Sequence, residues 1–357
     1  MTELLEKYKG TSVLITGGLG FIGSNLAHRL TAIGGVKVFI VDALLPGHGG
    51  NPHNIHGIRD QVTVYKANLS TDWVTNHIVV GMDYIFNLAG SVSHLDSMRD
   101  PLMDMELNCA GQIRLLEACR SFNPAARIVF TSTRQVYGNP TYLPVDEQHP
   151  IAPLDVNGIH KRAAELYHLL YHRVYGIPVV CLRLTNTYGP RQLVKHDRQG
   201  FIAWFIRQAM DGGVIEVFGD GKQERELVYV DDVVDALLLS GASKGSEGEI
   251  FNLGGDHPIS LTDLAGELIH LTGRGTIKLK SFPPERKLID LGSFYASYEK
   301  IESALGWRPK TSLGEGLQRT IEFYAKNREH YWNPVPVDLS QPEAMPETQS
   351  YKGATPR

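Results

Sequence analysis

The chain has 357 residues, of which 42% are hydrophobic and 21% charged, and its formal net charge at pH 7 is -4. The length predicts one large domain with a smaller one beside it, and the composition is typical of a soluble globular protein. The charge balance gives no reason to expect binding to nucleic acid or to an anionic membrane surface.

Targeting signals and cysteines indicate the cellular compartment. No apolar run is long enough to span a bilayer, and the first residues lack the apolar core of a signal peptide. The cysteines are odd in number and lie in apolar patterns, so we expect free buried thiols in a reducing cytoplasm rather than disulfides or a metal site. They are Cys109, Cys119 and Cys181.

The first predicted element is a buried strand at residues 13–15, followed by a helical pattern at residues 21–30. Three glycines lie at the strand-to-helix turn: Gly17, Gly20 and Gly23. In order, they would let the chain turn sharply, let the backbone approach a ligand, and let the helix pack against the strand. The N–H groups at the helix start, around Phe21 and Ile22, would face a pyrophosphate.

A second apolar run, residues 36–41, ends in Asp42. This position, about 20 residues beyond the glycines, is where a carboxylate would accept hydrogen bonds from an adenosine ribose. A carboxylate there would also repel a 2′-phosphate, so the sequence favours NAD over NADP. Alone, Asp42 could be an ordinary loop residue, but together with the glycine turn it predicts a dinucleotide-binding unit.

The next segments alternate strands with helices. Strands are predicted at residues 61–67, 82–90, 127–130 and 178–184, and helices at residues 104–122 and 163–175. This alternation predicts a parallel, doubly wound α/β sheet that binds its ligand at the carboxyl ends of the strands. Five residues at two strand ends would then lie against the cofactor: Asn68, Leu69, Leu88, Ala89 and Gly90.

From residue 189 the pattern loosens. Short helices are predicted at residues 201–210, 233–239, 261–271, 298–305 and 313–327, with a strand at residues 215–218. Residues 333–357 are rich in Pro, Gln, Ser and Glu, which predicts an extended or disordered tail.

Six motifs, in order along the chain, now resemble a known family. They are TGGLGFIG (16–23), TST…VYG (131–138), LRLTNTYGPR (182–191), GDGKQERE…YVDD (219–232), FNLGG (251–255) and LGW (305–307). Over roughly residues 10–325 the chain resembles the extended short-chain dehydrogenase/reductases and, more narrowly, the NAD-dependent sugar-nucleotide epimerase/dehydratases.

The resemblance implies a fold with two domains. Residues 1–185 would form an NAD-binding Rossmann domain, to which parts of 225–255 return. Residues 186–332 would mainly form a smaller C-terminal α/β domain that holds a nucleotide sugar in the cleft between the two. The family often pairs through helices around residues 104–122 and 161–175, so we expect a homodimer.

The resemblance also assigns contacts. Asn108 would lie at the cofactor, Ser91 and Asn186 at the sugar, Arg225 at the nucleotide diphosphate, and Arg286 at the diphosphate or nucleoside. An arginine fork suits phosphate oxygens, although a surface salt bridge is the alternative role for both arginines.

The catalytic positions depart from the family pattern. Family members place a tyrosine four residues before a lysine on one helix face, and a Ser or Thr shares the proton. The lysine is Lys161 and the hydroxyl is Thr133, but the tyrosine position holds Asn157. An amide cannot act as a general base near neutral pH.

Three explanations compete for the missing base. His94, in the loop that lines the family's sugar pocket, could supply it, although it could equally be a surface loop histidine; His160 is turned about 100° around the helix from Lys161 and is a poor substitute. The substrate, or a water held by Asn157 and Thr133, could relay the proton instead. Or the protein binds NAD and nucleotide sugar without redox catalysis.

A second departure concerns the reaction. The family's dehydratases carry an Asp-Glu pair directly after the Ser or Thr, where this chain has Arg134 and Gln135. Because neither side chain can serve as acid or base at pH 7, the sequence favours epimerisation, or oxidation or reduction at one carbon, over elimination of water. Arg134 could pair with a substrate carboxylate, such as that of a uronic acid, or with a protein acid such as Asp146.

The predicted function is therefore an NAD-dependent epimerase, with a UDP-sugar 4-epimerase favoured and a dTDP-sugar as the other candidate substrate. The alternatives are a dehydratase or oxidoreductase with a different base, and a catalytically silent binding protein.

Overall fold

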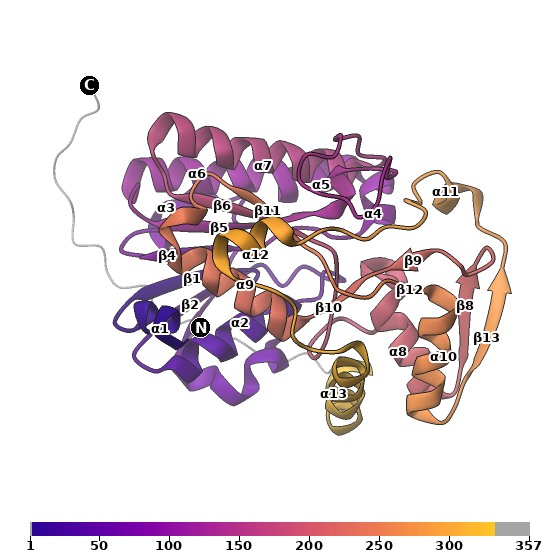
Figure 1. Ribbon diagram of the computed structural model, residues 1–357. Helices are drawn as coiled ribbons and strands as arrows, with labels where there is room; N and C mark the ends of the chain where they lie inside the picture. The colour runs from indigo at the N-terminus through magenta and orange to yellow at the C-terminus, as the bar shows by residue number, and fades with distance from the viewer. Residues whose placement is uncertain (1, 333–357) are drawn as a thin grey trace.

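A seven-stranded parallel sheet forms the centre of the computed structural model, which describes residues 2–332 (Figure 1). The strand order is β11-β6-β5-β4-β1-β2-β3. The strands are β1 (Ser12–Thr16), β2 (Lys37–Asp42), β3 (Val62–Lys66), β4 (Tyr84–Asn87), β5 (Arg127–Thr133), β6 (Val179–Leu184) and β11 (Ile250–Leu253). The predicted doubly wound sheet is confirmed, while the predicted tail at residues 333–357 lies outside the described residues.

Helices cover both faces of the sheet, which explains why its strands are continuous apolar runs. On one face lie α2 (Phe21–Ile33) and α9 (Val230–Ala242), whose Leu26 and Val233 join the core around Val13. On the other lie α3 (Asp72–Ile78), α6 (Gly111–Phe122) and α7 (Val156–Tyr175), and Figure 1 shows α6 and α7 together on the side opposite α2 and α9. The loops that connect strands and helices therefore lie at the two ends of the strands.

Helix α7 begins at Val156, so it contains both the predicted helical segment 163–175 and positions 157 and 161, expected on one helix face. Asp155 caps it, since its Oδ1 accepts the N–H of Gly158 at 2.6 Å. This start puts Asn157 and Lys161 in the first two turns of the helix. The predicted helix at residues 104–122 is also divided, because a π-helical turn (Glu106–Ala110) separates α5 (Pro101–Met105) from α6.

A second group of elements, with its own hydrophobic core, begins with β7. Its side chains include Phe205, Leu264 and Leu317. The elements are β7 (Asn186–Tyr188), α8 (Phe201–Asp211), β8 (Val214–Phe218), β9 (Glu224–Arg225), β10 (Leu227–Tyr229), β12 (Ile259–Ser260), α10 (Leu261–Thr272), β13 (Thr276–Lys280), α11 (Pro284–Lys287), α13 (Leu313–Lys326) and α14 (Arg328–Trp332). They pair as β7 with β10, β8 with β13, and β9 with β12.

Several late segments return to the central sheet. Strand β11 pairs with β6 in parallel, and α9 packs into the first core. Helix α12 (Glu299–Leu305) also returns, because Ile301 and Trp307 are buried in that core. The return thus extends beyond the predicted 225–255, and the division of the chain at residue 185 stays a prediction.

The remaining short elements connect these parts. They are α1 (Thr2–Leu5), α4 (His94–Arg99) and the 3-10 turns Glu6–Tyr8, Pro52–Gln61, Arg134–Val136, Asp197–Gln199 and Lys244–Ser246. All three cysteines are free, as expected; Cys119 and Cys181 are buried, whereas Cys109 is only partly buried.

Candidate active site

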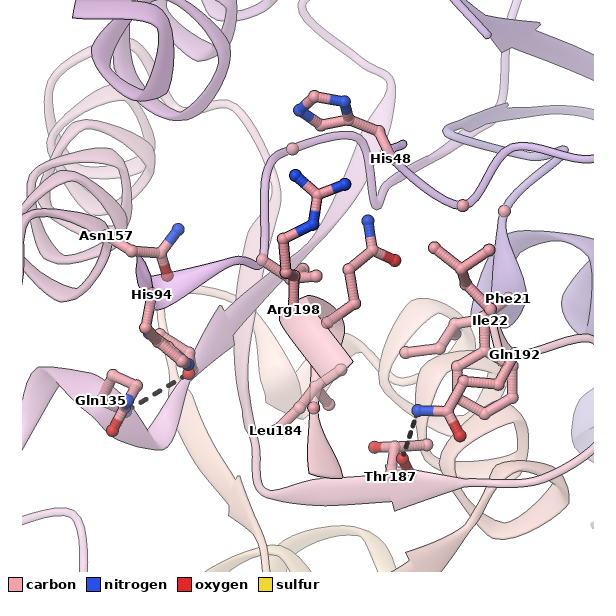
Figure 2. A pocket seen from close by; sticks show the side chains of 18 of the residues that line it. Phe21, Ile22, His48, His94, Gln135, Asn157, Leu184, Thr187, Gln192 and Arg198 are labelled. Atoms are coloured by element: carbon pink, nitrogen blue, oxygen red, sulfur yellow. Dashed lines mark hydrogen bonds between the residues drawn. The ribbon is translucent and has the colours of Figure 1, made fainter. Parts of the chain in front are cut away.

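One cavity of about 570 Å³ opens at the carboxyl ends of the central strands. Its walls come from the glycine turn, the ends of β2, β4 and β5, the first turns of α7, and the second group of elements. Figure 2 shows His94, Gln135 and Asn157 on one side of it, with Phe21 and Ile22 on the other. The position is the one at which open α/β sheets bind ligands.

The glycine turn leaves no space for side chains. Gly17 has a φ of +68°, and a Cβ there would lie 3.1 Å from the backbone of Ala89. A Cβ on Gly23 would lie 2.5 Å from the carbonyl oxygen of Gly17, so the helix packs directly on the turn. The first N–H groups of α2, which have no partner within a helix, border the cavity at Phe21 and Ile22. A pyrophosphate fits this position.

Asp42 ends β2 beside the glycine turn. Its Oδ2 accepts the N–H of Leu19 at 3.1 Å and its Oδ1 accepts the N–H of Leu44 at 2.8 Å. Burial raises the pKa of this carboxyl, and the two N–H donors partly oppose that rise. Each oxygen keeps a second lone pair, so the residue can still accept from ribose hydroxyls in the cavity that it lines.

The predicted strand-end residues line the same cavity: Asn68, Leu69, Leu88, Ala89 and Gly90. Asn108 and Ser91 do not line it. Both are buried behind the wall, where Asn108 Nδ2 donates to the Ser91 carbonyl at 3.1 Å. A Cβ on Gly90 would lie 2.4 Å from Asn108 Oδ1, so Asn108 supports the segment that borders the cavity, and direct ligand contact by Asn108 or Ser91 stays a prediction.

Lys161 lies in the cavity wall with its ammonium group buried. Its Nζ donates to the carbonyl of Thr131 at 3.0 Å and lies 5.0 Å from the centre of the Phe130 ring. Burial lowers the pKa of Lys161 to about 8, and the nearby charge of Asp104 opposes that decrease. The side chain is therefore fixed in place and mostly charged at pH 7.

Asn157 is fixed by both amide hydrogens. Nδ2 donates to the Ser91 carbonyl at 2.8 Å and to Asp104 Oδ2 at 3.1 Å. Since both partners are acceptors, the amide orientation is determined, and its carbonyl oxygen is the atom left for a ligand. Asp104 also pairs with His160 Nδ1 at 2.8 Å. Sequence reasoning missed Asp104, because only the fold brings it to position 157.

His94 begins α4 and faces a buried carboxylate. Its Nδ1 lies 2.9 Å from Asp155 Oδ2, while Gln135 Nε2 donates to the same oxygen at 3.3 Å. Burial acts to raise the pKa of Asp155, but His94 and the Gly158 N–H hold it below its ordinary value. Asp155 is a residue that sequence reasoning missed; its position just before a helix was the available signal. The contact is close, but Nδ1 makes no hydrogen bond in this arrangement. Because Nδ1 faces Asp155, Nε2 is the ring nitrogen left for a substrate.

Thr133 and three further polar residues extend the wall toward the second group of elements. Thr133 Oγ1 accepts the N–H of Gln135. Asn186 Nδ2 donates to the carbonyl of Glu226 at 2.9 Å, which turns its Oδ1 toward Arg134 Nη2 at 3.1 Å. All of them except Glu226 line the cavity.

The two predicted phosphate arginines line the cavity and also contact protein carboxylates. Arg225 is buried, donates to the carbonyls of Glu224 and Gly292, and lies 3.5 Å from Asp290 Oδ1. Arg286 pairs with Asp197 at 2.6 Å and lies over the Phe218 ring. Both guanidinium groups therefore form the salt bridges that were the alternative to phosphate binding. Both also line the cavity, where they could contact an anionic ligand.

Within residues 2–332, no helix is both long and apolar enough to cross a membrane, and no group of three His, Cys, Asp or Glu side chains is arranged to hold a metal ion. Three features of the cavity fit a dinucleotide. They are the tight glycine turn at Gly17 and Gly23, the carboxylate of Asp42, and the fixed ammonium group of Lys161. These features define a Rossmann-type enzyme that uses a dinucleotide cofactor.

The comparisons with known proteins agree. The chain belongs to the NAD-dependent epimerase/dehydratase family, whose model matches residues 13–254, and it is an NAD-dependent enzyme of the extended short-chain dehydrogenase/reductase type. It is 35% identical over 316 residues to a putative UDP-glucose 4-epimerase of Methanocaldococcus jannaschii, covering 88% of this chain and 99% of that protein.

Solved structures give the same family. An epimerase from Methanothermobacter thermautotrophicus has a TM-score of 0.86 at 27% identity, covering 92% of this chain and 96% of that one. The dTDP-glucose 4,6-dehydratase DesIV of Streptomyces venezuelae, solved with NAD bound, has a TM-score of 0.82 at 29% identity, covering 90% of this chain and 99% of that one. The relatives therefore include both epimerases and dehydratases.

Proposed function

We propose that this protein is a nucleotide-sugar 4-epimerase that acts on a UDP-sugar, with His94 in place of the usual tyrosine as the proton-transferring group. The observation that carries the proposal is the pairing of His94 with the buried carboxylate of Asp155 in the wall that also holds Thr133 and Lys161. A carboxylate beside one ring nitrogen of a histidine favours the orientation that leaves the other nitrogen for proton transfer. The similarity to a putative UDP-glucose 4-epimerase favours UDP.

NAD, when bound, accepts a hydride from a sugar carbon and returns it. The protein's own residues handle the proton. His94 Nε2 removes the hydroxyl proton as the carbon is oxidised and gives it back after the keto sugar has rotated in the site, while Asp155 lies beside Nδ1. Thr133 hydrogen-bonds the reacting oxygen, Asn157 offers its carbonyl oxygen to the same region, and Lys161 holds the cofactor ribose.

Elimination of water needs both an acid and a base beside the sugar, as well as the hydride step. Arg134 and Gln135 follow Thr133 in the cavity wall, and neither exchanges protons at pH 7. One histidine suffices for a 4-epimerase, since the same proton leaves and returns. This difference favours epimerisation over dehydration.

The test is turnover of UDP-glucose, UDP-galactose and dTDP-glucose by the protein supplied with NAD. We expect interconversion of the two UDP-sugars without net formation of NADH. His94→Gln should lower kcat by about 10²- to 10⁴-fold, the usual contribution of a general base, with NAD affinity unchanged.

The matched control is His270→Gln, which changes an exposed histidine of α10 and should keep full activity. Full activity of His94→Gln would show that another group moves the proton. Tight binding of UDP-sugars without any product, or release of a dehydrated product, would contradict the 4-epimerase assignment itself.

The same proposal includes a homodimer built on α7. Four apolar side chains of this helix are exposed and recur at helical spacing, so they share one face: Ile159, Leu166, Leu170 and Val174. Leu102 of the neighbouring α5 is exposed beside them in the fold. A second copy of the chain, presenting the same face, would cover this surface.

A further inference from the structure

Arg134 is a cavity residue whose charge the proposed reaction does not use. It follows Thr133 at the end of β5 and lines the cavity, with its guanidinium 5.3 Å from the centre of the Phe294 ring. Nη2 donates to Asn186 Oδ1, whereas Nη1 is buried and has no hydrogen-bond partner. An unpaired buried donor on a charged group is costly.

Protein carboxylates do not satisfy this group. Within residues 2–332, Arg134 forms no ion pair. The ion pair with Asp146 that the sequence left open is absent, because Asp146 Oδ1 accepts instead from the Tyr142 hydroxyl at 2.7 Å and the Gln148 N–H at 3.0 Å.

Glu226, an acidic neighbour of Arg134, is itself weakened as a counter-ion. Glu226 is fully buried, and neither of its carboxylate oxygens has a hydrogen-bond partner. Burial raises the pKa of Glu226 to about 7, whereas burial and the charge of Arg225 lower the pKa of Arg134 to about 10. At pH 7 Arg134 is therefore charged. The charges of Glu226, Asp290 and Asp155 act on it, but none of these carboxylates forms an ion pair with it among the described residues.

The neighbours of Arg134 indicate which part of a ligand it meets. Thr133, assigned above to the reacting sugar oxygen, precedes it in the chain, and Arg225, assigned to the diphosphate, is close enough to repel it. A cation beside both groups would meet the sugar ring of a nucleotide sugar, and a planar guanidinium fork matches a carboxylate.

We propose that Arg134 selects a nucleotide sugar whose hexose carries a carboxylate, a nucleotide hexuronate. The inference rests on the proposed function, since it names the substrate class of the same site. The ligand would then bring two anionic parts, the diphosphate toward Arg225 and the carboxylate toward Arg134, and it would supply the counter-charge that the protein lacks there.

The test is calorimetric titration, in the presence of saturating NAD, with UDP-glucuronate, its neutral 6-amide and UDP-glucose. We expect the parent protein to bind UDP-glucuronate at least about tenfold more tightly than the other two, the size of one charge-assisted contact. In Arg134→Gln this preference should fall to about one. Arg198→Gln removes another cation from the same cavity wall and should leave the preference intact.

The comparison of UDP-glucuronate with its 6-amide uses only the parent protein, so the test holds even if Arg134→Gln does not fold. The melting temperature of the variant shows whether it folds. Equal affinity of the parent for all three sugars overturns the inference and leaves the proposed function standing. A preference for UDP-glucuronate that survives in Arg134→Gln would also overturn the inference. An equal loss of affinity for all three UDP-sugars in Arg134→Gln would overturn it too, because Arg134 would then contact the diphosphate. If no UDP-sugar binds the parent, the proposed function fails first, and the inference with it.

Discussion

At the scale of single residues, Asn157 is joined to its surroundings in a way that a tyrosine could not reproduce. Its amide ties α7 to the Ser91 carbonyl and to the buried Asp104. We therefore expect Asn157→Tyr to lower turnover at least about tenfold and to lower the melting temperature, because Asp104 loses a donor and a ring occupies the cavity. Steady-state kinetics on UDP-sugars and thermal unfolding measure both effects.

His94→Ala is the companion variant. A faster Asn157→Tyr enzyme, combined with a His94→Ala variant as active as the parent, would contradict proton transfer by His94. It would indicate a family member that has been weakened by the loss of its tyrosine. A slower Asn157→Tyr enzyme with an inactive His94→Ala variant supports proton transfer by His94.

The residues that sequence reasoning found were those with a local signature. Gly17, Asp42 and Lys161 belong to motifs with fixed spacing, and the structure brings them to one cavity. Asp104 has no such signature, and Asp155 has only its place directly before a helix. Asp104 reaches Asn157 only through the packing of α5 against α7, and this pairing across the sequence cannot be predicted from one chain.

At the scale of elements, the contact between the glycine turn and α2 leaves no space for a methyl group. A Cβ on Gly23 would meet backbone atoms of Gly17 and Gly18 at 2.5 and 2.7 Å. We expect Gly23→Ala to lower the free energy of unfolding by about 2 kcal/mol or more, since helix and turn must separate, and to weaken NAD binding. Chemical denaturation and calorimetry provide the two measurements.

Gly266→Ala is the matched control, because Gly266 lies inside α10 and a Cβ there meets no atom within 4 Å. It should raise the free energy of unfolding by about 0.5–1 kcal/mol through helix propensity and the loss of unfolded-state freedom. Equal effects of the two substitutions would mean that the close contact at Gly23 is unimportant.

The elements predicted from sequence were the long, buried ones. Strands such as β1 and β6 are mostly apolar because both faces are covered, so their composition identifies them. The short strands β7, β9, β10 and β12 have two or three residues each. That is too few for any periodicity to appear, and their pairing depends on distant segments.

At the scale of the whole molecule, the exposed apolar face of α7 predicts association. We expect the parent protein to be a dimer by multi-angle light scattering and Leu170→Asp to be mainly monomeric, because a charge would be buried in the interface. Leu288→Asp changes a more exposed leucine elsewhere and should remain dimeric. A monomeric parent, or dimers that persist in Leu170→Asp, would show that this face is not the interface.

Strand β11 and helix α9 pack on the central sheet although they come late in the chain. The chain therefore cannot be cut into two independently folding fragments at residue 185. A fragment ending at residue 185 would lack β11, so β6 would become an open edge strand with unpaired backbone groups. It would also lack α9, leaving the apolar side chains under Leu237 and Val233 without cover. The cofactor half is therefore completed by residues from well beyond position 185, such as Ile250 opposite Cys181. Until these later segments have folded onto the sheet, its open edge and uncovered apolar face are exposed to aggregation.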